Sequence, residues 1–249
     1  MHALIVHSHP EPRSFNAALT ATARQTLADN GARVTVSDLY AEGFDPLESP
    51  RHYGPRADPD YFSALTEQRH AGHSHSRPAD VQREIDRLEA ADLVILQFPL
   101  WWHAQPAILK GWFDRVFVYG DLYTGRMRYD EGHFHGKRAL LSVTTGGPAE
   151  TFSPYGRGGP IERLLWPIHY SLHYMGFDVL PPFVAHAVQG GGISYAQRDV
   201  FERHLEERKN AWAERLTALD EAKPIPFTGW RDWDDDGVLR ADHPLRWGP

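Results

Sequence analysis

Two adjacent tryptophans and a histidine, Trp101-Trp102-His103, lie between a run of apolar residues and a proline-led amphipathic stretch. Large aromatic side chains are normally buried, so two indoles in a short connection are candidates for contact with a ligand. Pro99 and Leu100, immediately before them, extend the same apolar surface. A flat conjugated molecule would stack on such a surface. Packing of both indoles in the core or at an interface is the alternative.

The residues from His9 to Asn16 suit an anion. Ser14 is a good cap for a helix that starts at Phe15, and the free N–H groups of that first turn attract phosphate or pyrophosphate. The Arg13 guanidinium and the Ser14 hydroxyl would add to this attraction. Because the loop is neither a Walker loop nor a G-x-G-x-x-G motif, helix capping alone is the competing explanation.

A third candidate is the run Thr144-Thr145-Gly146-Gly147. Glycine lets a ligand approach the backbone closely, and hydroxyl and N–H groups can bind the polar edge of a ring. An ordinary turn would use the same residue types, so this run is informative only together with the other two.

His169 and His173 are four residues apart on a predicted helix, so they would share a face and could bind zinc. The chain has no cysteine, and neither an H-E-x-x-H motif nor a nearby carboxylate completes a ligand set. We therefore expect two helix histidines and no metal.

Strands and helices alternate along the chain, which predicts an α/β fold with a parallel sheet. The apolar runs at 3–6 and 93–96 do not alternate with polar residues, as expected of strands covered on both faces. Five strands fit the flavodoxin-like doubly wound order 2-1-3-4-5, in which ligands bind beyond strands one, three and four. The three candidate loops follow these strands, and the five expected strands span residues 3–6, 33–37, 93–96, 138–143 and 177–188.

Two segments have no sustained periodicity. Residues 41–79 are rich in Gly, Pro, His, Asp and Arg, and we expect a functional excursion or disorder there. Residues 223–249 form an irregular tail that we expect to pack on the main domain, residues 1–222, or on a dimer partner.

The composition excludes several classes of protein. The net charge of −7, with 33 acidic and 26 basic residues interspersed, disfavours nucleic acid as a partner. No apolar run reaches the length of a membrane span or of a signal peptide. The absence of cysteine fits a reducing compartment, so we expect a cytoplasmic protein.

Several motifs in collinear order, over roughly residues 3–228, resemble the NAD(P)H:quinone oxidoreductases of the DT-diaphorase type. They are Ala3-Leu4-Ile5-Val6 leading to His9 and Ser14-Phe15-Asn16, Ser37-Asp38-Leu39-Tyr40, Leu88 to Ile95, Pro106 to Phe117, Thr144 to Gly147, Leu165-Trp166-Pro167-Ile168 and Lys223-Pro224-Ile225-Pro226.

The resemblance implies a homodimer with one FAD per subunit and active sites across the interface. Reduced nicotinamide, NAD(P)H, would pass hydride to the flavin and then give way to a quinone in the same slot. It places the pyrophosphate at the first loop, the isoalloxazine against Pro99 to Trp102 and the polar ring edge at Thr144 to Gly147. Trp102 and His103 would flank the substrate, and Tyr123 and Tyr174 match aromatic positions that the partner subunit contributes. The 41–79 excursion would cover the adenine half, which favours FAD over FMN.

This chain departs from the family at several positions. A tyrosine and a histidine thought to stabilise charge on the reduced flavin fall at Phe152 and Gly158, and neither can share a proton. Tyr155 or Arg157 is the replacement that the sequence offers. Gly125 and His103 replace a tyrosine and a phenylalanine of the slot, which makes the slot wider and more polar.

Phe227 replaces the cysteine ligand of the family's zinc-binding branch, which argues against zinc here.

We therefore expect an FAD-dependent quinone-type oxidoreductase with ping-pong, two-electron transfer. The residues assigned to catalysis are Trp102, His103, Gly146, Gly147 and Tyr155, and those assigned to the substrate are Trp102, His103, Tyr123, Phe152 and Tyr174. Two alternatives stay open: a flavin-binding regulatory protein with little turnover, and an FMN-dependent, azoreductase-like enzyme.

Overall fold

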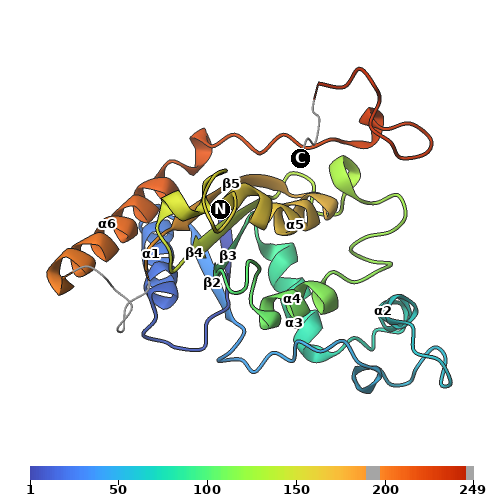
Figure 1. Cartoon of the computed structure of the whole chain (residues 1–249). Coiled ribbons are helices and arrows are strands. Elements are labelled where there is room, and N and C mark those ends of the chain that lie inside the picture. Colours follow the sequence, from blue (N-terminus) through green and yellow to red (C-terminus); the bar gives the residue numbers. More distant parts are fainter. Residues whose placement is uncertain (189–196, 245–249) are drawn as a thin grey trace.

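The computed structural model describes residues 1–188 and 197–244. Its centre is a sheet of five parallel strands in the order β2-β1-β3-β4-β5 (Figure 1). This is the predicted fold and strand order. The strands are β1 (His2–His7), β2 (Arg33–Asp38), β3 (Leu93–Pro99), β4 (Arg138–Thr144) and β5 (Asp178–Ala185).

Helices cover both faces of the sheet (Figure 1). They are α1 (Phe15–Asp29), α2 (Ala64–His73), α3 (Ala79–Ala90), α4 (Ala107–Val116), α5 (Ile161–Tyr174) and α6 (Arg198–Thr217). Leu4 and Val6 of β1 pack in the apolar cluster with α3, α4 and α5, whereas Ala3 and Ile5 pack with α1 and α6. Successive side chains of a strand point to opposite faces, so a strand buried on both faces is apolar throughout.

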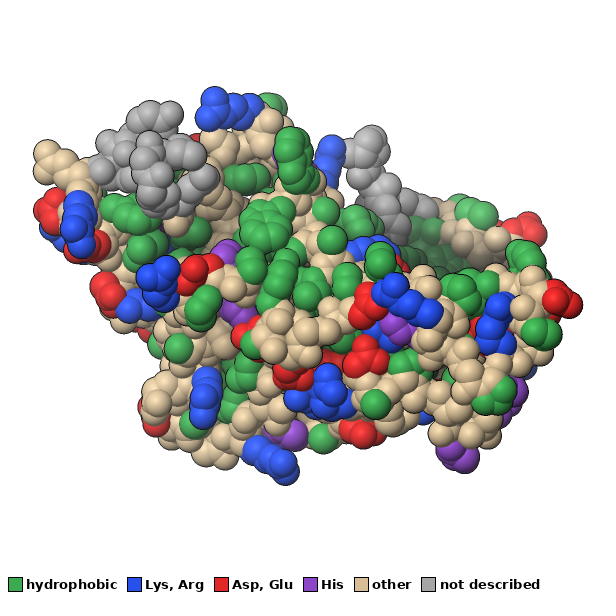
Figure 2. All heavy atoms as spheres, turned by 90° about the horizontal axis from the view of Figure 1, so that it is seen from below, with side chains coloured by type: hydrophobic (Ala, Val, Ile, Leu, Met, Phe, Trp, Pro, Cys, Tyr) green, Lys and Arg blue, Asp and Glu red, His purple; other side chains and the backbone are tan. Residues whose placement is uncertain are grey.

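Charged side chains of both signs are interspersed over the face drawn in Figure 2, while apolar side chains gather near its middle. None of the helices in the described parts of the chain is long and apolar enough to cross a membrane.

The expectation of a fully irregular segment at 41–79 was wrong, because α2 occupies its second half. The buried residues of α2 include Glu67 and Gln68 together with Ala71 and Gly72, so the helix has no apolar stripe to reveal it. Glu67 accepts a hydrogen bond from the Ala57 N–H at 2.9 Å, which ties the helix to the loop before it.

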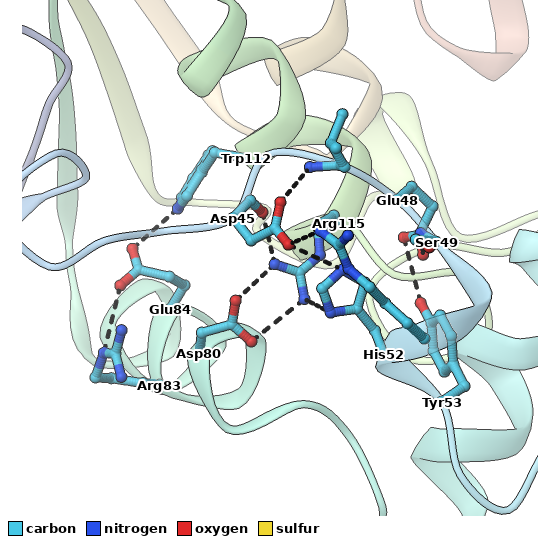
Figure 3. Close-up of polar contacts among 12 residues, drawn as sticks. Asp45, Glu48, Ser49, His52, Tyr53, Asp80, Arg83, Glu84, Trp112 and Arg115 are labelled. Atoms are coloured by element: carbon cyan, nitrogen blue, oxygen red, sulfur yellow. Dashed lines mark hydrogen bonds and ion pairs between the residues drawn. The ribbon is translucent and has the colours of Figure 1, made fainter.

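A buried arginine holds the first half of this segment against the sheet domain (Figure 3). Arg115 of α4 is 1% exposed, and its Nη1 donates to Asp80 Oδ2 at 2.5 Å and to the Asp45 carbonyl at 2.7 Å. Its Nη2 lies 3.3 Å from His52 Nδ1, and the guanidinium lies 5.2 Å from the Phe44 ring centroid. The Arg115 guanidinium therefore joins α3 and α4 to the segment 44–52.

The described part of the C-terminal tail runs beside α5 (Figure 1). The Ile225 N–H donates to the Val179 carbonyl at 2.8 Å, and Trp230 Nε1 donates to the Arg128 carbonyl at 2.9 Å. The tail therefore contacts its own domain in a single chain. The domain boundary at residue 222 stays a prediction.

Candidate functional site

The carboxyl ends of β1, β3 and β4 border a cavity of about 390 Å³, here called the cradle. All three loops singled out in the sequence contribute to it. Its lining residues are His9, Ser14, Phe15, Asn16, Pro99, Leu100, Trp101, Thr144, Thr145, Gly146 and Val188. No carboxylate is among them, so the walls offer donors, hydroxyls and aromatic surface.

Beneath the cradle, a buried amide network joins α1 to two strands. Asn16 Nδ2 donates to Thr144 Oγ1 at 3.0 Å, and Asn16 Oδ1 accepts from Gln97 Nε2 at 2.9 Å. Gln97 Oε1 and the Ser8 hydroxyl are buried and have no hydrogen-bond partner among the described residues. Buried polar atoms normally have a hydrogen-bond partner, so these two atoms are candidates to bind a ligand or water.

The start of α1 supplies the donor side of the cradle. The Ser14 hydroxyl accepts from the Ala17 N–H at 3.1 Å, as a helix cap does, so the capping prediction is confirmed. The N–H groups of Phe15 and Asn16 belong to the first turn and have no acceptor within the helix. They and the positive end of the helix dipole provide a place for an anionic group.

His9 adds a neutral donor beside this helix end. Burial lowers the pKa of His9, and its Nδ1 accepts a hydrogen bond from the Glu11 N–H at 3.1 Å. In the neutral ring the proton therefore resides on Nε2, which is left as a donor.

The loop after β4 is fastened to the end of β5. The Thr145 N–H donates to the Ala185 carbonyl at 3.0 Å, and the Thr145 hydroxyl donates to the Gly147 carbonyl at 2.9 Å. At Gly147 an added Cβ would lie 2.9 Å from Thr151 Oγ1, so the Thr151 hydroxyl would have to shift to admit a side chain. Glycine therefore suits the close packing of this loop.

The two tryptophans occupy different places. Trp101 is 41% exposed and lines the cradle, with its ring centroid 5.8 Å from that of His9, whereas Trp102 is 97% exposed and stands outside. Trp101 and Ala104 exchange two backbone hydrogen bonds, of 3.0 and 3.1 Å, around a two-residue turn. Both central residues have positive φ, 51° at Trp102 and 60° at His103. Glycine or asparagine normally occupies such positions, so the turn is strained.

Some predicted site residues lie elsewhere in the chain. Arg13 does not line the cradle: its side chain is 88% exposed and pairs with Glu11 at 2.9 Å. Tyr155 is fully exposed, and His103 lies at the exposed turn. Phe152 packs behind the β4 loop, and Gly147 adjoins the cradle without lining it. In a single chain, neither Arg13 nor Tyr155 contributes a side chain to the lining of the cradle, so their roles stay predictions.

Tyr123 and Tyr174 lie in a second cavity, of about 570 Å³, which shares no lining residue with the cradle. Their ring centroids are 5.6 Å apart. The 41–79 segment contributes residues to this second cavity and none to the cradle. That the segment covers the adenine half of a cofactor stays a prediction. The segment residues in the second cavity are Glu48, Ala64, Leu65 and Gln68.

Comparison with known proteins shows the family of this chain. A family model described as a flavodoxin-like fold matches residues 1–216. The ribosyldihydronicotinamide dehydrogenase [quinone] of Pongo abelii is 43% identical over 227 residues, covering 90% of this chain and 94% of that protein. The chain belongs to the flavodoxin-like quinone oxidoreductase family. Its resemblance to this family in sequence is thus confirmed.

Two further relatives belong to the same family. The NAD(P)H dehydrogenase [quinone] 1 of Cavia porcellus is 40% identical, with 90% of this chain and 79% of that protein covered. The crystal structure of a candidate quinone reductase from Klebsiella pneumoniae has a TM-score of 0.86 and 38% identity, covering 96% of this chain and 94% of the other.

His169 and His173 of α5 are both buried. His173 Nε2 donates to the Thr228 carbonyl at 2.9 Å, and the Phe227 ring stacks on His173 at 4.4 Å with an interplanar angle of 10°. Burial lowers the pKa of His169 to about 4. Among the described residues, no group of three histidines and carboxylates is placed to hold a metal ion. The Phe227 phenyl ring thus packs on His173, at the position where the resemblance would place a third ligand.

Two residues near the site escaped the sequence reasoning. Val188 lines the cradle, and His186 hydrogen-bonds to Thr145 from behind. Both follow β5, which ends at Ala185, whereas the sequence predicts a strand through Val188. The sequence therefore assigns them to the strand, and no motif marks them as neighbours of a ligand.

Proposed function

We propose that this chain is an FAD-dependent NAD(P)H:quinone-type oxidoreductase that works as a homodimer, in the cytoplasm. The cradle is the observation that carries the proposal. It unites a capped helix N-terminus, an indole surface and a Thr-Thr-Gly wall at the carboxyl ends of β1, β3 and β4, where such sheets bind ligands. The relatives are named as quinone dehydrogenases, which supports the same class of reaction here.

Each wall of the cradle has a task in this proposal. The N–H groups of Phe15 and Asn16, with Ser14 and His9, would hold the pyrophosphate. Pro99, Leu100 and Trp101 would lie against the ring system, and the loop from Thr144 to Gly147 would bind its polar edge. The flavin, when bound, supplies the hydride chemistry in two alternating half-reactions.

The acceptor slot would lie above the ring, with the exposed Trp102 and His103 along one side. Tyr123 of the partner subunit and Tyr174 of the partner subunit would close it, since in one chain these residues face a different cavity. Burial raises the pKa of Tyr123, so its hydroxyl stays protonated and can donate to a quinone oxygen.

Two kinds of electron donor are candidates: the dinucleotides NADH and NADPH, and the smaller dihydronicotinamide riboside. The relatives' names include both NAD(P)H and ribosyldihydronicotinamide as donors. A direct comparison of NADH, NADPH and dihydronicotinamide riboside decides between them, because all three carry the same reactive ring.

The visible spectrum of the purified protein, without oxygen, tests the proposal. After addition of each donor, a flavin band should bleach within seconds and return when a quinone is added. Mass measurement of the released cofactor distinguishes FAD from FMN, and thus from an azoreductase-like enzyme. A band that persists with every donor would favour a flavin-binding regulatory protein. A colourless protein that takes up neither FAD nor FMN would refute the cofactor assignment.

The two tryptophans provide a matched pair of variants. Trp101→Ala removes a wall of the cradle and should weaken flavin retention, measured by the FAD released on dilution. Trp102→Ala leaves the cradle intact and should lower quinone turnover with the flavin retained. Equal loss of both properties in both variants would contradict these separate roles.

A further inference from the structure

His186 lies directly behind the wall of the cradle. It follows β5, is half-buried, and its Nδ1 is 2.9 Å from the Thr145 hydroxyl oxygen. Its ring stacks on Phe152 with centroids 5.6 Å apart and an interplanar angle of 29°. Thr145 itself lines the cradle, so this imidazole lies directly behind the residue that forms the cavity wall.

The hydrogen bonds around His186 fix where it can gain a proton. The Thr145 hydroxyl donates its hydrogen to the Gly147 carbonyl at 2.9 Å, so its oxygen must accept from Nδ1–H of His186. Nδ1 thus carries hydrogen in both charge states, and protonation occurs at Nε2. The ring keeps its place during titration because the bond to Thr145 persists.

The charges facing His186 come from three elements. Burial lowers its pKa, Glu150 and Glu162 raise it, and Arg208 of α6 lowers it. His204 of α6 is held against the same backbone, since its Nε2 donates to the His186 carbonyl at 2.9 Å. With these neighbours alone the imidazole is neutral at pH 7, and negative charge arriving nearby would favour its cation.

We propose that His186 takes up the proton that balances negative charge in the cradle, as a positioning residue that acts through Thr145. This inference rests on the proposed function. Phe152 and Gly158 stand where a proton-sharing tyrosine and histidine were expected, and neither has a titratable group. The proton comes from solvent to Nε2 and returns when the charge leaves, so no bond other than N–H is formed or broken.

The pKa of His186 can be measured directly by NMR on protein labelled with [13C]histidine. The titration is recorded for the flavin-free protein, the protein with oxidised FAD and the protein reduced chemically with dithionite. We expect the His186 pKa to rise by about one unit or more on reduction, the effect of a charge a few ångströms away. A pKa that is the same in the oxidised and reduced protein would overturn the proposal.

Two variants distinguish proton uptake from a merely structural role. His186→Asn places an amide near the position of Nδ1 and can keep the bond to Thr145 without titrating. It should bind FAD like the parent protein, yet lose the proton uptake on reduction and shift the midpoint potential measured against pH. His204→Gln, which can preserve the bond to the His186 carbonyl, is the matched control and should change neither property.

The outcomes separate this inference from the proposed function. A protein that binds and reduces flavin normally while the His186 pKa stays constant would refute the inference and leave the oxidoreductase assignment in place. If His186→Asn keeps the parent's proton uptake and potential, a structural role explains the contact with Thr145. Failure to bind any flavin would remove both proposals together.

Discussion

Replacing His103 by glycine tests whether backbone strain holds the Trp102 indole in place. Trp102 and His103 both have positive φ within a turn that two hydrogen bonds close. Glycine adopts this conformation freely. Because the His103 side chain is exposed, little packing is lost with the imidazole, and the backbone effect dominates.

The size of the effect follows from two opposing free energies. A left-handed backbone costs a residue with a Cβ about 1–2 kcal/mol, which glycine avoids. Glycine also gains conformational freedom in the unfolded chain, which offsets about 0.4–1 kcal/mol. The free energy of unfolding should therefore rise by about 0.5–1 kcal/mol, equivalent to about 1–4 °C in Tm for a chain of this size.

His103→Ala is the matched control, because alanine removes the imidazole and keeps the Cβ. Thermal and urea unfolding of both variants should place the glycine variant above the alanine variant by the same net free energy, about 0.5–1 kcal/mol. In the proposed enzyme, His103→Gly should also lower quinone turnover, since a flexible turn no longer fixes Trp102. Flavin retention should stay unchanged.

Two results would refute this reasoning. If His103→Gly is no more stable than His103→Ala, the positive φ values store no strain. If the glycine variant is more stable and turns over quinone as fast as the parent, the turn is strained for reasons unrelated to positioning Trp102.

Three other predictions concern side chains that hold parts of the fold together. Arg115→Met should destabilise the fold by about 1.5–3 kcal/mol, since the charged hydrogen bonds to Asp80 are lost while the Asp80 carboxylate, 27% exposed, can still be hydrated; urea unfolding measures this, and the double variant with Asp80→Leu should recover part of the loss. His169 has a folded pKa of about 4 against 6.5 when unfolded, so stability should fall by about 2 kcal/mol from pH 7 to pH 5 on its account; His169→Phe should flatten that slope in urea titrations, and an unchanged slope would contradict the assignment. Trp230→Ala should lower the free energy of unfolding by about 1 kcal/mol or less and speed proteolysis of the tail. A cleavage rate equal to that of the parent protein would show that the contacts of Trp230 do not hold the tail on the domain.

The strand order could be predicted because the central strands are apolar on both faces. Leu93 to Leu96 and Ala3 to Val6 are all fully buried, so their sequence gives both the strands and their coverage by helices. The three loops then meet because parallel strands end at one edge of the sheet. This topology places His9, Trp101 and Thr145 around one cavity without any contact being known beforehand.

Polar burial and backbone conformation could not be predicted in the same way. α2 is held by the hydrogen bonds of Glu67 and Gln68, which look like surface residues in a sequence. The positive φ values at Trp102 and His103 depend on the turn that closes between β3 and α4. His186 meets Thr145 because β5 pairs with β4, a contact that no local motif records.

The separation of the cradle from the cavity of Tyr123 and Tyr174 has a consequence for genetics. In the proposed dimer, each active site would combine the cradle of one copy with the tyrosines of the other. A mutant allele that damages the cradle and another that damages the tyrosine face would each be inactive alone. Expressed together, they would form mixed dimers with one undamaged site, so two defective alleles could restore up to half of the activity per mixed dimer.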